Sequence, residues 1–83
     1  MSDAVRVLFF ASLREDVGCA EAQVQAADTA ELLAALAAQL PEGAMQALTQ
    51  DNVRIAVNQQ IIEGNTPLGS GDEVAFLPPV TGG

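Results

Sequence analysis

Several residue types that commonly carry chemistry are missing from this chain of 83 residues, which contains no histidine, lysine, tryptophan or tyrosine. Without histidine or lysine the commonest general bases are absent, and no Ser-His or Cys-His nucleophile pair can form. There is also no GxxxxGK loop for ATP and no cluster of His and Cys ligands for zinc. We therefore expect no catalytic centre, bound cofactor or metal site built from this chain alone.

Cysteine and long apolar runs are scarce as well. Cys19 is the only cysteine, so an intramolecular disulfide is impossible and a secreted disulfide scaffold is excluded. Residues 1–3 lack the basic region and apolar run of a signal peptide. No apolar stretch approaches the roughly 20 residues that span a bilayer. We expect a cytoplasmic protein.

Positive charge is rare. Eleven acidic residues face only Arg6, Arg14 and Arg54, and the net charge is −8. Binding to nucleic acids or anionic lipids requires clustered cations, so neither partner is expected. The acidic surface favours basic protein partners through electrostatic steering. The alternative reading is that the acidity only confers solubility.

Hydrophobic periodicity predicts one main helix and several strands. The helix runs from about Thr29 to Leu40, because Asp28 and Glu31 have the spacing of a capping box and Pro41 stops the pattern. Ser12 and Glu15 have the same spacing before a short helical turn that ends near Gly18, and residues 44–50 could add another turn. Alternating apolar residues predict strands at residues 4–10, 21–26, 53–57, 60–63 and 73–77.

This element order predicts an α+β domain over residues 1–77, with one main helix packed on one face of a mixed sheet. Residues 78–83, Pro-Pro-Val-Thr-Gly-Gly, form the predicted extended tail. Prolines favour an extended exit, and glycine passes through passages too narrow for a side chain. Six extended residues reach at most about 20 Å, enough to enter a partner's cleft. The alternative is a frayed chain end without function.

The segment GDEVAFLPPVTGG (residues 71–83) resembles the C-terminal signature of molybdopterin synthase small subunits. Residues 7–11 and 13–15 resemble the first strand and turn of that family, and residues 56–59 resemble its third strand. Leu77 departs from the family pattern, where an aromatic residue is common. The resemblance covers the whole chain in order and implies the ubiquitin-like β-grasp fold.

The resemblance also implies a mechanism. In the family, an adenylating enzyme that resembles ubiquitin-activating enzymes uses ATP to activate the terminal carboxylate, here Gly83. Sulfur then replaces AMP and leaves a thiocarboxylate. The tail enters the large subunit of the synthase, where the sulfur passes to a pyranopterin precursor of the dithiolene that binds molybdenum. Gly82 keeps the approach narrow. The implied complex is a heterotetramer with two large subunits.

Strand parity predicts where that partner binds. If Val5, Val7 and Phe9 face the helix, then Leu8 and Phe10 point to the opposite face, which one helix cannot also cover. Ala75, Leu77 and one of Ile61 and Ile62 share that face, and exposed apolar area beside a tail is typical of an interface. The alternative is a few apolar residues tolerated on the surface. The resemblance favours as partner-binding residues Phe10, Ile61, Leu77, Pro78, Pro79, Val80 and Thr81.

Two other functions fit the same fold. One is a sulfur carrier of another pathway, such as the thiamine-pathway carrier, which also ends in Gly-Gly but usually lacks the preceding Pro-Pro-Val-Thr. The other is a ubiquitin-like modifier or passive interaction module. A modifier would form amide bonds to target lysines, whereas a carrier would be recovered with a free tail that holds sulfur.

Overall fold

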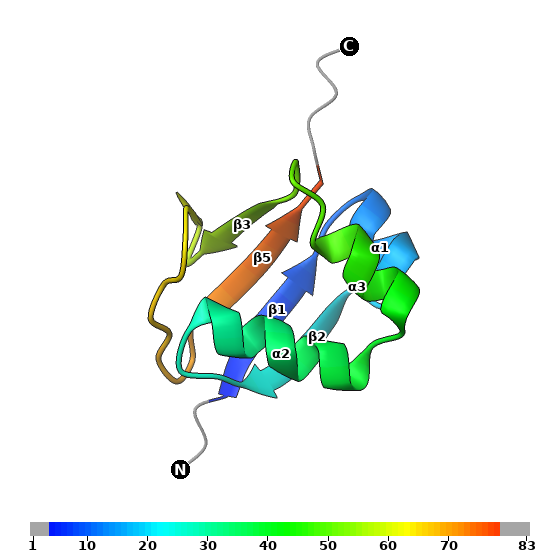
Figure 1. The fold of residues 1–83 in the computed structure, drawn as a ribbon. Coiled ribbons are helices and arrows are strands. Elements are labelled where there is room, and N and C mark those ends of the chain that lie inside the picture. Colours follow the sequence, from blue (N-terminus) through cyan, green and yellow to red (C-terminus); the bar gives the residue numbers. More distant parts are fainter. Residues whose placement is uncertain (1–3, 79–83) are drawn as a thin grey trace.

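The computed structural model describes residues 4–78, which form a mixed sheet and three helices (Figure 1). In chain order the elements are β1 (Ala4–Phe9), α1 (Ser12–Val17), β2 (Glu21–Gln25), α2 (Thr29–Gln39), α3 (Glu42–Leu48), β3 (Arg54–Val57), β4 (Gln60–Ile62) and β5 (Glu73–Leu77). The predicted tail residues Pro79, Val80, Thr81, Gly82 and Gly83 lie outside the described residues.

The strand order is β2-β1-β5-β3-β4. The first and last strands are neighbours at the centre and run parallel, while the other pairs are antiparallel. Helices α2 and α3 lie on one side of the sheet, and α1 packs against α3 (Figure 1). This is the predicted α+β arrangement with a ubiquitin-like β-grasp topology.

The core lies between the sheet and the helices. Val5, Val7 and Phe9 of β1 alternate with outward residues, as do Val74 and Phe76 of β5, and all five are at most 1% exposed. The register pairs Val7 with Val74 and Phe9 with Phe76, and the two phenyl rings stack with centroids 5.8 Å apart. The helices and β2 add Leu13, Val17, Val24, Leu32, Leu36, Ala44 and Leu48 to the same cluster.

Helix α2 begins as the sequence predicts. The Asp28 Oδ1 accepts a hydrogen bond from the Glu31 N–H at 2.8 Å, and the Glu31 Oε1 accepts one from the Ala27 N–H at 2.9 Å. The first bond satisfies one of the amide groups that the helix start leaves unpaired, and the second ties the residue before the N-cap to the first turn. Leu32 and Leu36 of this helix are fully buried, and Leu33 and Leu40 are partly buried against the same core.

Two predictions for the short helices were wrong in detail. Ser12 is the first helical residue of α1, one position after the N-cap, so its side chain does not cap the helix. The N-cap is Ala11, which makes no side-chain cap hydrogen bond. Helix α3 begins at Glu42, two residues earlier than predicted, because Pro41 is extended and directly precedes its first turn. The predicted end of α1 is confirmed, since Gly18 is left-handed with φ of 92°.

The long connection between β4 and β5 is fastened to the start of α2. The Asn65 Oδ1 accepts hydrogen bonds from the Thr29 Oγ1 and the Ala30 N–H at 3.0 and 2.9 Å. The Asn65 Nδ2 donates to the Asp28 Oδ2 at 3.2 Å, and the Thr66 N–H donates to the Thr29 Oγ1 at 3.0 Å. These bonds satisfy the buried Thr29 hydroxyl and hold the connection against α2.

Replacement of a core leucine tests the packing of α2. We expect Leu36→Ala to lower the free energy of unfolding by about 2–5 kcal/mol, because it leaves a cavity in a close-packed core. Gln46→Ala, at an exposed position of α3, is the control and should change it by less than about 0.5 kcal/mol. Urea denaturation measures both. A loss below about 1 kcal/mol for Leu36→Ala would contradict a close-packed site.

The hydrogen bonds to Asp28 predict a pH dependence of stability. The Glu31 N–H and the Asn65 amide donate to this carboxylate and hold its pKa below the ordinary value of 3.8. A lowered native pKa stabilises the fold above pH 3.8, and this contribution is lost as the pH falls through the native pKa. Asp28→Asn retains a capping oxygen but does not titrate. The difference in unfolding free energy between the wild-type protein and Asp28→Asn, measured by urea denaturation, should therefore become smaller as the pH is lowered below about 4. A pH-independent difference would contradict the assignment.

Candidate functional site

The face of the sheet opposite the helices, here called the outer face, carries a row of apolar residues. The register pairs Leu8 with Ala75, Ala75 with Ala56 and Ala56 with Ile61, across β1, β5, β3 and β4. Directly paired residues point to the same side of a sheet. The row therefore crosses four strands without an intervening polar side chain.

The three predicted partner-binding residues of the folded domain lie on or beside this row. Ile61 forms its β4 end and is 55% exposed, whereas Ile62 pairs with Ile55 and faces the core side. Leu77 shares the face of Ala75 on β5 and is half-buried. Phe10 directly follows β1 and is 42% exposed, and its N–H donates to the Phe76 carbonyl at 3.2 Å.

The middle of the row is less open than strand parity alone suggests. Ala75 and Ala56 are only 7% and 5% exposed although they point away from the helices. Figure 1 shows α2 and α3 on the other side of the sheet, so these two helices do not account for the burial of the two alanines. The exposed apolar area of the outer face therefore comes from larger side chains at its borders, such as Phe10 and Ile61, and the two central alanines contribute little to it.

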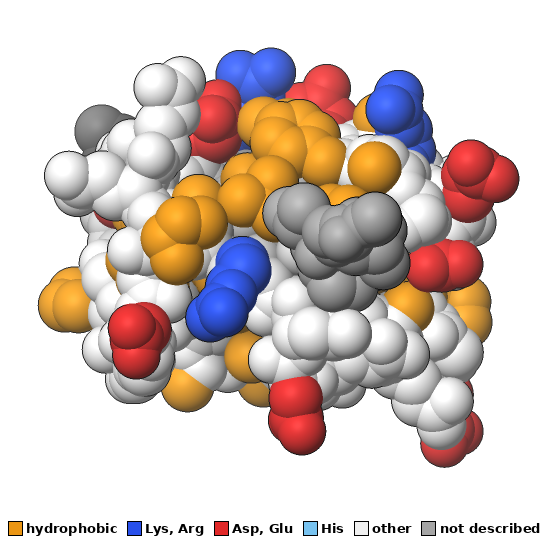
Figure 2. All heavy atoms as spheres, turned by 90° about the horizontal axis from the view of Figure 1, so that it is seen from above, with side chains coloured by type: hydrophobic (Ala, Val, Ile, Leu, Met, Phe, Trp, Pro, Cys, Tyr) orange, Lys and Arg blue, Asp and Glu red, His pale blue; other side chains and the backbone are white. Residues whose placement is uncertain are grey.

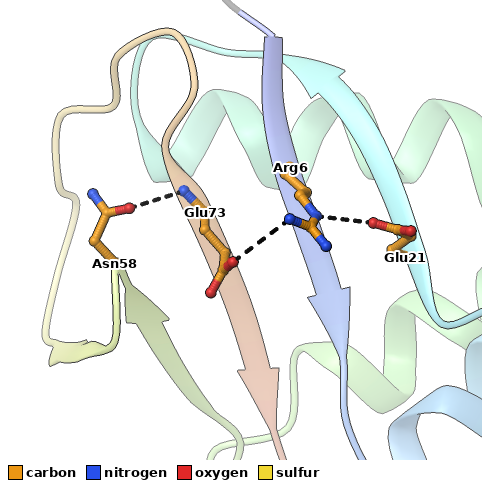
Figure 3. A network of polar contacts seen from close by, with 4 residues as sticks. All are labelled: Arg6, Glu21, Asn58 and Glu73. Carbon is orange, nitrogen blue, oxygen red and sulfur yellow. Dashed lines mark hydrogen bonds and ion pairs between the residues drawn. The ribbon is translucent and has the colours of Figure 1, made fainter.

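The other end of the outer face is polar (Figure 3). Arg6 donates from Nε to the Glu21 Oε2 at 3.0 Å, and its Nη1 lies 4.0 Å from the Glu73 Oε1. The Asn58 Oδ1 accepts from the Glu73 N–H at 3.1 Å, and the Asn58 Nδ2 donates to Asp72. Exposed ion pairs contribute little stability, so this network mainly marks where the apolar surface stops.

The apolar part of the outer face lies at the end of the molecule where β5 stops. Figure 2 views that end, and hydrophobic side chains form a band there with basic side chains at its border and most acidic ones toward the periphery. Leu77 ends β5 there, followed by Pro78, which is half-buried. The predicted tail is therefore joined to the domain beside this surface.

Other features of the described residues do not form a competing site. Within residues 4–78, no three His, Cys, Asp or Glu side chains gather as around a metal ion, and no helix is long and apolar enough to cross a membrane. Cys19 is half-buried against the core. An open hollow of about 470 Å³ lies at the opposite end of the sheet and is lined by Ala4, Gln23, Val24, Gln25 and Gln39. It contains none of the predicted site residues.

The family model described as the ThiS family matches residues 7–83. This chain belongs to the ThiS family. It is 49% identical over 82 residues to the molybdopterin synthase sulfur carrier subunit of Escherichia coli (strain K12), and the match covers 95% of this chain and 99% of the relative. The predicted resemblance to the sulfur carrier family is thereby confirmed.

Solved structures agree with this membership. SAMP1 from Haloferax volcanii superposes with a TM-score of 0.81 at 26% identity, covering 96% of this chain and 99% of its own. A subunit in the protein complex of subunits 1 and 2 of molybdopterin-converting factor from Helicobacter pylori 26695 superposes with a TM-score of 0.70 at 33% identity. That match covers 96% of this chain and 99% of the other. Both superpositions confirm the predicted β-grasp fold.

One outward residue of the site escaped the sequence reasoning. The alternation that predicts the strand at residues 53–57 sets Arg54 and Ala56 apart from Val53, Ile55 and Val57 but assigns Arg54 no role. The register shows that Arg54 pairs with Leu77 and lies on the outer face next to the row. The sequence contains part of this information, because Arg54 and Ala56 alternate with the core-facing residues of the same strand. Their position beside β5 depends on the strand order, which the sequence pattern does not give.

Proposed function

We propose that this chain is the sulfur carrier subunit of molybdopterin synthase. The observation that carries the proposal is its 49% identity, over nearly the full length of both chains, to the E. coli subunit of that name. In this proposal Gly83 is adenylated, converted to a thiocarboxylate and used to donate sulfur to the pyranopterin precursor for dithiolene formation. Support comes from the Gly82-Gly83 terminus and from the apolar outer face at the tail end of the domain.

The chemistry accounts for a chain without catalytic residues. A carboxylate is a poor electrophile because its charge is delocalised and its oxygen leaves badly. An adenylating partner that uses ATP makes AMP the leaving group. The terminal sulfur of a persulfide donor attacks the acyl carbon and displaces AMP, and a thiol then reduces the resulting S–S bond, which releases the thiocarboxylate and leaves a disulfide on the donor side. Binding and acid–base groups come from the partner enzymes. This chain supplies the reacting carboxyl carbon of Gly83 and the residues before it that lead into the partner. No cofactor bound by the chain is part of the proposal.

The proposed binding partner on the outer face is the large subunit of the synthase. The H. pylori relative is in a complex of subunits 1 and 2 of molybdopterin-converting factor. Phe10, Ile61 and Leu77 are the proposed contacts, with Pro78 and the residues after it leading into the partner. Two carriers and two large subunits form the proposed heterotetramer, and the adenylating enzyme is a second, separate partner.

A ubiquitin-like modifier is the second candidate, because SAMP1 belongs to the small archaeal modifier proteins and superposes with a TM-score of 0.81. Intact-mass analysis of the protein from its native cell separates the two functions. A carrier is recovered with a free tail heavier by the oxygen-to-sulfur difference. A modifier is recovered in amide linkage to lysines of other proteins. Recovery of conjugates without any sulfur-bearing tail would overturn the carrier proposal.

The tail variants test the reacting residue. Deletion of Gly83, or extension of the chain beyond it, should abolish sulfur transfer in a reconstituted synthase, because the reacting carbon is the terminal carboxyl of a glycine. Gly82→Ala should impair transfer by adding a side chain in a narrow passage, with little effect on the melting temperature. Ser2→Ala is a control at the other end of the chain. Full activity from an extended, uncleaved tail would refute this mechanism.

Charge introduced on the outer face tests the docking surface. Phe10→Asp or Leu77→Asp should weaken binding to the large subunit at least about 10-fold, because a buried interfacial position would then hold an unpaired carboxylate. Gln23→Asp adds the same charge to the outer face on β2, away from the apolar row, and should bind normally. Calorimetric titration measures affinity, and circular dichroism checks folding. Unchanged affinity of both apolar-site variants would place the interface elsewhere.

A further inference from the structure

The three arginines of this acidic chain have different surroundings. Arg6 is held by Glu21 and Glu73 at the polar end of the outer face. Arg14 lies on α1, outside the strands of the sheet. Arg54 is exposed on β3, and its side chain forms no hydrogen bond or salt bridge with residues 4–78. It is the arginine on the outer face that the described part of the chain leaves unpaired.

The register puts Arg54 inside the proposed docking surface. It is the cross-strand partner of Leu77, the last residue of β5, and shares the outer face with Ala56, two residues along β3. Paired residues on adjacent strands lie within about 5.5 Å of each other. The guanidinium is therefore attached beside Leu77, at the base of the tail.

A nearby acid does not neutralise it. Continuation of the β3–β4 register, in which Ile55 pairs with Ile62, would bring Glu63 opposite Arg54. Glu63 is exposed beyond the end of β4 and makes no salt bridge with Arg54. The charge of Arg54 is consequently available to a molecule that covers the outer face.

Covering this face would remove water from the guanidinium. A buried charge is costly unless it is paired and hydrogen-bonded, and the planar guanidinium matches the two oxygens of a carboxylate. The position of Arg54 also specifies orientation. A partner attracted by the net charge of −8 through its own basic surface can place a carboxylate opposite Arg54 in one rotational position only.

We propose that Arg54 is a positioning residue that pairs with an Asp or Glu side chain of the large subunit and sets the direction in which the tail enters it. The inference rests on the proposed function and adds to it the chemistry of one contact: a carboxylate on the partner, opposite the base of the tail. The apolar contacts supply most of the affinity, and the ion pair fixes the register between the two surfaces.

Binding kinetics of charge variants test this inference. The full chain and the purified large subunit are mixed, and the affinity and the association and dissociation rates are measured. We expect Arg54→Gln to weaken binding about 10-fold and Arg54→Glu about 100-fold, mainly through faster dissociation. Arg54→Lys keeps the charge but loses the planar fork, so it should lie between wild type and Arg54→Gln. Arg14→Gln makes the same charge change on α1 and is the matched control.

A second measurement excludes a merely structural effect. Replacement of each Asp and Glu on the facing surface of the large subunit by Arg should identify one variant that restores binding of Arg54→Glu. If the wild-type chain binds the large subunit and both Arg54→Glu and Arg54→Gln bind it with the same affinity, the inference about Arg54 is overturned. The proposed function is not affected by that result. Failure of the wild-type chain to bind the large subunit would overturn both the inference and the proposed function.

Discussion

The parallel pairing of β1 with β5 is the interaction on which the rest of the structure depends. It joins the two ends of the chain at the centre of the sheet, with Val7 beside Val74 and Phe9 stacked on Phe76. Parallel strands need a long connection, and here the segment between them supplies all three helices and the other strands. Because both central strands point toward the same end, Phe10 and Leu77 leave the sheet close together.

This arrangement gives the two faces of the sheet different roles. The helical side is closed by residues such as Leu32 and Leu36, which are fully buried. The outer face divides along the strands, with the Arg6 network at one end and the apolar row toward the other. A charged end limits how far an apolar partner surface can extend. The proposed docking surface therefore lies toward the end at which β5 stops.

A carrier of this kind separates chemistry from structure within one short chain. In the proposed function the domain supplies recognition through the apolar outer face and Arg54, while the reaction takes place at a terminal carboxyl group. The acidic surface is compatible with fast encounter with basic partners, since steering acts over about a Debye length. In this proposal the domain needs no general base or nucleophile of its own, which agrees with the lack of histidine and lysine in the sequence.

The sequence by itself determined the secondary structure and the core. Asp28 and Glu31 specified the start of α2, and alternation specified β1 and β5, because these signals depend on neighbours only a few residues away. Local pattern failed at the ends of short helices: Ser12 had the spacing of a cap but occupies a helical position in α1. The family relationship was also readable from the motifs at residues 7–11 and 71–83.

Only the tertiary structure decided which residues share the outer face. Whether Ile61 or Ile62 points outward depends on the β3–β4 register, and a shift by one residue would exchange them. The burial of Ala56 and Ala75 and the position of Arg54 beside Leu77 depend on β3 and β5 being neighbours. These two strands are joined through β4 and a long connection, and pairing between distant segments is set by packing of the whole sheet, which no local pattern contains.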